Sequence, residues 1–142
     1  MPKVHDSRVI RMPKRKIYDL MMDIEAYPRF IPFIRAARVL EKRDDGLLAE
    51  IRVGVPGLAF TYRCEVTATP HEQIDVKDVA GPFRFLKARM TFSDTHGGTK
   101  VDYYFESQFR SHMMNAVADP IFTPLLQSTL AGIERFIGRK KP

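Results

Sequence analysis

The side chains that most often carry catalysis or bind metal are few in this chain and widely spaced. Its single cysteine is Cys64, and its histidines are His5, His71, His96 and His112. No Cys/His pair has the spacing of a zinc site, and a lone cysteine excludes an internal disulfide. The sequence also lacks the G-x-S-x-G and H-E-x-x-H motifs and a glycine-rich phosphate loop. We therefore expect no catalytic residue, no metal site and no cofactor.

Carboxylates are plentiful, but in the strand-like segments they alternate with cations on the outward face. This alternation is typical of cross-strand surface pairs rather than of acid/base catalysis. The examples are Glu50 with Arg52, Arg63 with Glu65, and Asp102 and Glu106 with Arg110. Cys64 falls on an inward position, which predicts an inert buried thiol. His5 and His112 are candidates for polar points in a cavity, with a purely structural role as the alternative.

The apolar residues are more informative than the polar ones. The chain has 10 Phe, 5 Tyr and 7 Met and no Trp, and methionine is favoured where a binding surface must adapt. A segment framed by Pro28 and Pro32 carries Tyr27, Phe30, Ile31 and Phe33. Such bulky groups are costly to expose, so we expect this segment to gate an apolar pocket or to touch a membrane. Ordinary core packing is the alternative.

Periodicity defines the elements that must position these groups. Apolar and polar residues alternate, which predicts strands over residues 3–11, 35–42, 47–55, 59–69, 73–79, 84–93 and 99–110. The last strand is the clearest, with inward positions Val101, Tyr103, Phe105, Ser107 and Phe109. Six consecutive strands with short turns predict an antiparallel meander with one apolar face.

Helical spacing occurs in two places. Residues 14–23 predict a short amphipathic helix, followed by at most one further helical turn. The C-terminal segment predicts one long helix that covers the apolar face of the sheet, with an apolar stripe that includes Met113, Met114, Val117, Ile121, Phe122, Leu125 and Leu126. Pro120 and Pro124 predict a kink or break near residues 119–124, with Asp119 or Thr123 capping the second segment.

Charge and hydropathy indicate a soluble, cytoplasmic chain. No apolar run reaches the roughly 18 residues of a membrane span, and no secretory signal is visible at the start. The net charge of +6 comes from the two ends: residues 1–16 hold six basic residues against Asp6, and Arg139, Lys140 and Lys141 follow at the other end. If these ends meet, they attract anionic lipid headgroups or phosphates. We expect peripheral contact with the inner face of a membrane, and no binding to DNA.

Two motifs carry a resemblance to a known family. Residues 27–32, Y-P-R-F-I-P, match a Y-P-x-F-x-P motif after the first helix, and residues 81–86, G-P-F-R-F-L, match a G-P-F-x-x-L motif that enters a late strand. With this order of elements, the chain resembles the coenzyme Q-binding START-domain family of the polyketide cyclase/lipid-transport superfamily. This family includes ribosome-association toxins of the RatA type. The resemblance covers about residues 3–138.

The resemblance implies an α+β helix-grip (START-like) fold. A curved antiparallel sheet of about seven strands would wrap around a long C-terminal helix, with two short helices after the first strand, and residues 1–142 would form a single START-like lipid-binding domain. It also implies a non-enzymatic role, in which ubiquinone or a similar isoprenoid lipid is held in a hydrophobic tunnel and supports respiratory electron transport or quinone delivery. Burial of a prenyl chain yields about 25 cal/mol per Å² of apolar area, so no metal or nucleophile is needed.

The predicted site combines the motif residues with the inward positions of the strands and the long helix. Its ligand-binding residues are Tyr27, Pro28, Phe30, Ile31, Pro32, Phe33, Tyr62, Phe83, Leu86, Met90, Phe92, Tyr103, Phe105, Met113, Met114, Val117 and Ile121. Candidates to bind the quinone head are Tyr62, Tyr103, Ser107 and His112. We expect the mouth of the tunnel beside Phe30 and Met113.

Two other functions remain open. The resemblance to RatA-type toxins suggests a protein that binds the large ribosomal subunit and blocks subunit association. An aromatase/cyclase on the same scaffold would need polar groups along the cavity, whereas the inward positions here are mostly apolar. Fold alone does not decide among these functions.

Overall fold

The computed structural model describes residues 3–140, with the side chains of residues 3–138. One sheet dominates it, and every pair of neighbouring strands is antiparallel. Its strands are β1 (Lys3–Ile10), β2 (Ile34–Arg43), β3 (Gly46–Val55), β4 (Leu58–Thr69), β5 (Gln73–Ala80), β6 (Phe83–Thr95) and β7 (Gly98–Phe109), in the spatial order β1-β7-β6-β5-β4-β3-β2. The six later strands form the predicted meander, and β1 adds to its end beside β7.

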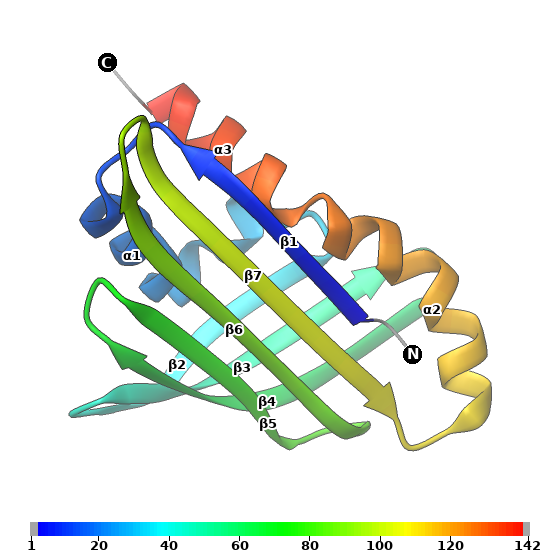
Figure 1. The fold of residues 1–142 in the computed structure, drawn as a ribbon. Coiled ribbons are helices and arrows are strands. Elements are labelled where there is room, and N and C mark those ends of the chain that lie inside the picture. The colour runs from blue at the N-terminus through cyan, green and yellow to red at the C-terminus, as the bar shows by residue number, and fades with distance from the viewer. Residues whose placement is uncertain (1–2, 141–142) are drawn as a thin grey trace.

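The helices are α1 (Lys14–Met22), the 3-10 helix η1 (Ile24–Arg29), α2 (His112–Gln127) and α3 (Thr129–Lys140). The curved sheet wraps toward α2 and α3, which run end to end along its open side (Figure 1). α2 begins where the Ser111 hydroxyl accepts a hydrogen bond from the Met114 N–H at 3.2 Å, an N-cap of the usual kind. The predicted seven strands, two short helices and covering C-terminal helix are confirmed.

The long helix is divided at a different place from the one predicted. α2 continues through Pro120 and Pro124 and ends at Gln127. The N–H of its C-cap, Ser128, donates to the carbonyls of Pro124 and Leu125 at 3.2 and 3.3 Å. The prediction of a break near residues 119–124 was therefore wrong, and neither Asp119 nor Thr123 caps the second helix. Both prolines lie on the exposed side of α2, where water can hydrate the carbonyls whose helical hydrogen bonds they remove.

The core lies between the inner face of the sheet and the helices. The inward stripe of α2 is Ala118, Phe122 and Leu126, and α3 continues it with Leu130, Ile133 and Ile137, all at most 8% exposed. From the sheet, Ala49, Cys64, Val66 and Val101 are buried as their alternation predicted. Within residues 3–140, no helix has both the length and the apolar character needed to cross a bilayer.

Within the described residues, two of the six basic side chains of the N-terminal segment form ion pairs. Arg8 donates to Glu134 of α3 at 2.7 Å, and Lys14 bridges Glu72 at 2.8 Å and Asp94 at 3.5 Å. The Arg8–Glu134 pair holds β1 beside α3, so the first strand and last helix do meet. Lys141 lies outside the described residues, as do the side chains of Arg139 and Lys140.

Candidate functional site

A cavity of about 140 Å³ lies between the sheet and the junction of α2 with α3. Every strand from β2 to β7 contributes to its wall, together with α1, η1, the segment after η1, α2 and α3. The wall comprises Met21, Ile24, Tyr27, Ile31, Phe33, Ile34, Ile51, Val53, Phe60, Tyr62, Cys64, Val66, Ile74, Val76, Phe83, Leu86, Ala88, Arg89, Met90, Tyr103, Phe105, Ser107, Phe109, Phe122, Leu126 and Thr129. Arg89 is the one charged residue in this wall, and its guanidinium is paired with Asp75 at 2.6 Å.

One end of the cavity is aromatic. Phe83 stacks on Phe109 with ring centroids 4.6 Å apart, and Phe60 meets both rings edge-on at 5.5 and 5.3 Å. Phe122 of α2 closes this end, 6.1 Å from Phe60 and 5.6 Å from Phe33. Edge-to-face and offset-stacked pairs of this kind contribute beyond their buried area, so this end holds its shape and offers ring faces to a flat ligand.

Few hydroxyl groups border the cavity, and they differ in their partners. The Tyr27 hydroxyl donates to the Met21 carbonyl at 2.6 Å, which ties η1 to α1. The Tyr103 hydroxyl interacts with the Thr129 side chain. Within the described part of the chain, Tyr62 and Ser107 make no side-chain hydrogen bond. These two hydroxyls are therefore available to a ligand.

Burial sets the protonation of the groups around the cavity. It raises the pKa of the Cys64 thiol to about 12, with the nearby Asp78 carboxylate adding to the effect. It also raises the pKa of Tyr27, Tyr62 and Tyr103 above the ordinary value of a tyrosine. Apart from Arg89, which is paired with Asp75, the groups that line the cavity are therefore neutral at physiological pH. Cys64 is confirmed as a buried thiol, and its raised pKa disfavours the reactive thiolate.

These raised pKa values predict a loss of stability in alkali. Above about pH 9 the unfolded chain releases protons that the folded chain retains, so the free energy of unfolding falls as pH rises. Each of these groups contributes at most about 1.4 kcal/mol per pH unit once its unfolded form ionises. Spectrophotometric titration of tyrosinate is expected to show Tyr27, Tyr62 and Tyr103 ionising in one cooperative step, together with loss of far-UV circular dichroism. Gradual ionisation of all five tyrosines with the fold intact would contradict this.

The G-P-F-x-x-L motif shapes the wall beside Tyr62. Gly81 has a φ of +138°, and a Cβ there would lie 2.6 Å from the Cβ of Tyr62. Only glycine permits that approach. Asp78 lies opposite Cys64 on the inward face, and its carboxylate accepts the Leu86 N–H at 2.8 Å, where the β5–β6 ladder has ended. Asp78 thus holds β6 to β5 at the motif.

The structure places nine of the predicted ligand-binding residues on the cavity wall, and contact with a ligand stays a prediction for each. They are Tyr27, Ile31, Phe33, Tyr62, Phe83, Leu86, Met90, Tyr103 and Phe105. The segment after η1 turns inward instead of toward solvent, since Phe30 and Ile31 are 8% and 7% exposed. Its predicted membrane contact is therefore wrong, and the expectation of an apolar pocket beside it is confirmed.

The other eight predicted residues lie away from the wall. Phe30 packs on Phe136 with centroids 4.9 Å apart, and Phe92 packs on Tyr18 at 6.0 Å. Pro32 is exposed and Pro28 half-buried. The predicted α2 residues lie off the wall for a common reason. The helix turns Ala118, Phe122 and Leu126 toward the core, and Phe122 and Leu126 line the cavity, so the stripe one residue earlier faces away from it. Met113 is 77% and Val117 48% exposed, while Met114 and Ile121 are half-buried at the flanks.

The predicted mouth beside Phe30 and Met113 is therefore wrong, because neither residue lines the cavity. His5 and His112 are exposed and contribute nothing to the cavity. The outward carboxylates do form cross-strand pairs, with partners other than those expected: Glu50 binds Arg38 and Arg63, and Glu65 binds Arg43. Within the described chain, no three His, Cys, Asp or Glu side chains gather as a metal site.

The prediction also missed much of the wall, above all Phe60, Phe109, Phe122 and Leu126. The signal for the strand residues was present, because Phe60 and Phe109 occupy inward positions of the period-two pattern. For α2, the apolar residues cover so much of the helix surface that periodicity alone does not select the buried stripe.

Comparison with known proteins gives a consistent result. The sequence matches the polyketide cyclase/dehydrase and lipid transport family over residues 10–134. The ribosome association toxin RatA of Rickettsia prowazekii is 24% identical over 133 residues, 91% of each chain. The mitochondrial coenzyme Q-binding protein COQ10 homolog B of Xenopus laevis is 24% identical over 139 residues, 94% of this chain and 57% of that protein.

Solved structures share the fold. TTHA0849 of Thermus thermophilus superposes with a TM-score of 0.82 at 17% identity, covering 99% of this chain and all of its own. A START superfamily protein of Mycobacterium smegmatis gives 0.69 at 20% identity over 96% and 95% of the two chains. The ZhuI aromatase/cyclase of Streptomyces sp. R1128 gives 0.79 at 11% identity over 97% and 94%. The predicted helix-grip fold is confirmed.

Proposed function

The chain belongs to the polyketide cyclase/dehydrase and lipid transport family, and on that premise we propose that it binds ubiquinone or a similar isoprenoid lipid in the cavity without catalysing a reaction. Binding of a hydrophobic ligand is supported by the family match, because the family includes lipid transport proteins. The choice of a quinone is supported by the likeness to a coenzyme Q-binding protein and by the chemistry of the wall.

The observation that carries the proposal is a largely apolar wall whose one charged residue, Arg89, is paired with Asp75, and which has two hydroxyls without a side-chain hydrogen bond. Stacked phenylalanines at one end suit a flat ring, and aliphatic residues such as Ile51, Val66 and Ile74 suit a prenyl tail. A quinone has carbonyl oxygens that accept hydrogen bonds, which Tyr62 and Ser107 are placed to donate. The wall holds neither carboxylate nor histidine, so we propose binding alone, with no cofactor.

The size of the cavity limits how much of such a ligand it can hold. A cavity of about 150 Å³ holds a benzene ring, whereas larger ligands occupy roughly 300–1,000 Å³. The present 140 Å³ therefore accepts one ring or a short length of prenyl chain. Holding more requires a wall to move, and α2 is the candidate, because only Ala118, Phe122 and Leu126 of its sixteen residues are buried.

Mass spectrometry of an organic extract tests the proposal. Protein purified without detergent is expected to release a quinone or another prenyl lipid in near-stoichiometric amount. The Ala88→Phe variant, in which the cavity is filled, is expected to release none. An extract free of lipid, from a protein that also fails to bind added ubiquinone, would contradict the proposal.

Replacing Tyr62 by phenylalanine is expected to weaken ubiquinone binding by roughly 3–10-fold, the effect of one lost hydrogen bond. Affinity for a prenyl alcohol with the same tail and no quinone ring is expected to change less. Tyr104→Phe is the matched control, because its hydroxyl bonds to Glu106 away from the cavity. Equal effects of the two variants in calorimetric titration would show that Tyr62 does not bind the head group.

A second function is favoured by the likeness to ribosome association toxins over nearly the whole chain. Under it, the protein binds the large ribosomal subunit and blocks association of the subunits. Co-sedimentation with purified large subunits, weakened steeply by salt, would support this function. The two functions also differ for Ala88→Phe, which alters the interior alone and is expected to leave ribosome binding unchanged.

A further inference from the structure

Three of the four strongly exposed large apolar side chains in the described residues lie toward one end of the molecule. In the described part of the chain, four large apolar side chains are strongly exposed: Val9, Val79, Met113 and Val117, at 48–77%. Val79 lies near the end of β5, and Met113 and Val117 lie on the outward face of α2. Monomeric proteins rarely cluster such groups without a partner.

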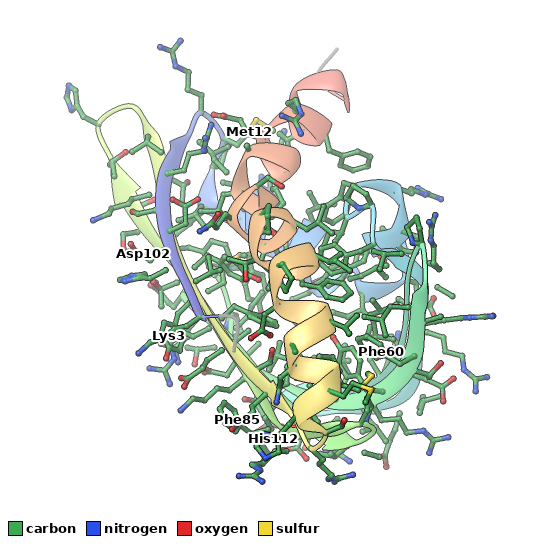
Figure 2. All side chains as sticks on the ribbon, turned by 90° about the vertical axis from the view of Figure 1, so that its right-hand side faces the viewer. Lys3, Met12, Phe60, Phe85, Asp102 and His112 are labelled. Atoms are coloured by element: carbon green, nitrogen blue, oxygen red, sulfur yellow. The ribbon has the colours of Figure 1, made fainter. Side chains whose placement is uncertain are left out.

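The topology places these three residues toward the same end of the molecule. β3, β5 and β7 end, and β4 and β6 begin, at the same end of the antiparallel sheet, and α2 starts there after two intervening residues. We call this end of the molecule the tip and define it by residues 52–61, 79–85 and 109–118. Phe60 of the first segment contacts Phe109 of the third at 5.3 Å. Figure 2 shows His112 and Phe85 together at this end, with Phe60 nearby.

The tip is positively charged. Its three segments contain Arg52, Arg84 and Arg110 and no Asp or Glu. These arginines are exposed and form no salt bridge within the described residues. The carboxylates that approach the tip along the strands are engaged: Glu50 by two arginines, Glu106 by Lys87 and the Tyr104 hydroxyl, and Asp78 by the Leu86 N–H. The next acidic residue on α2, Asp119, is half-buried.

We propose that the tip docks this protein on an anionic lipid bilayer, with Met113, Val117 and Val79 entering the headgroup region and the arginines binding lipid phosphates. Exposed apolar groups that share one end of the molecule with arginines free of salt bridges, and with no carboxylate in the tip segments, complement an anionic leaflet. A ribosomal surface is the alternative partner and is one outcome of the test.

The tip lies over the aromatic end of the cavity. Phe60, Phe83 and Phe109 belong both to tip segments and to the cavity wall, and Phe122 of α2 closes that end. A membrane at the tip would therefore face the lightly packed N-terminal half of α2, the wall proposed to move. Lipid could then pass into the cavity without crossing water. This step rests on the proposed function, whereas docking itself does not.

Flotation with vesicles of phosphatidylcholine, alone or mixed equally with phosphatidylglycerol, tests the docking surface. The wild-type protein is expected to float with the mixed vesicles and to be released at about 1 M salt, where the screening length is about 3 Å. Arg52→Gln with Arg84→Gln is expected to weaken partitioning by roughly 10–30-fold, since each arginine near an anionic leaflet contributes about fivefold. Met113→Gln with Val117→Gln is expected to weaken it by roughly tenfold, as two inserted apolar side chains are lost.

The matched control is Arg11→Gln with Arg15→Gln, which removes the same charge from exposed residues outside the tip. Equal losses from this pair and the tip pair would overturn the proposal, because net charge alone would then drive binding. It would also be overturned if the tip variants bound vesicles normally but no longer co-sedimented with large ribosomal subunits. Titration with a water-soluble short-chain ubiquinone separates the two proposals. The tip variants are expected to bind it as the wild type does. If the wild type does not bind it, the proposal of ubiquinone binding is refuted, while the proposal of membrane docking still stands.

Discussion

Ala88→Phe is expected to weaken ubiquinone binding by roughly 10–100-fold, the largest effect on function that a single side chain offers. Ala88 lies on the inward face of β6 between Val76 and Phe105 and lines the cavity. The substitution adds a phenyl ring, which is about the size of ligand that the 140 Å³ cavity holds. Exclusion of one ring-sized apolar group removes about 1.5–3 kcal/mol of burial from the ligand.

The control for this variant is Lys87→Phe, the same new side chain on the adjacent, outward position. Lys87 is exposed and interacts only at 3.8 Å with Glu106, so ubiquinone affinity is expected to stay within about twofold of the wild type, as for surface changes in general. Both variants are to be compared by calorimetric titration after circular dichroism has shown that they fold. A folded Ala88→Phe protein with wild-type affinity would show that the ligand binds elsewhere.

Phe83→Ala is expected to produce the largest loss of stability, about 3–5 kcal/mol. Phe83 is 3% exposed, and its ring contacts Phe60, Tyr62 and Phe109 at 4.6–5.5 Å. For a chain of this length, such a loss lowers the midpoint of thermal unfolding by about 10–15 °C. Urea denaturation and differential scanning calorimetry measure the two quantities.

Phe85→Ala provides the comparison on the same strand. A register shift between Phe83 and Phe85 places Phe85 outside the core, where it is half-buried. Its loss is expected to cost about 1 kcal/mol. Equal destabilisation by the two variants would contradict the assignment of Phe83, rather than Phe85, as the motif phenylalanine that supports the aromatic end.

The sequence predicted the sheet more accurately than the helices. On a strand, successive side chains alternate between two faces, so inward residues such as Cys64, Tyr103 and Ser107 were assigned correctly from the pattern alone. The register shift between Phe83 and Phe85 leaves two motif residues, Phe83 and Leu86, both facing inward. An alternating pattern alone would have put them on opposite faces.

The helical part of the site was predicted less well. α2 carries apolar residues around most of its circumference, so Met113 and Val117 fitted a stripe as well as Phe122 and Leu126 did. Their actual positions depend on the cap at Ser111 and on contacts with distant strands, which local periodicity does not contain. The predicted break near residues 119–124 was wrong for a similar reason. Local sequence does not show that both prolines lie on the exposed face of α2, where they disturb the helix less than they would on a buried face.

Nuclear magnetic resonance of methionine methyl groups during ubiquinone titration tests the central claim most directly. Met21 and Met90 line the cavity, whereas Met113 projects from α2 into solvent. With short-chain ubiquinone added to wild-type protein without membranes, the account predicts saturable shifts of the Met21 and Met90 signals, little change at Met113, and loss of the shifts in Ala88→Phe. Shifts confined to Met113, or none at saturating quinone, would contradict the account.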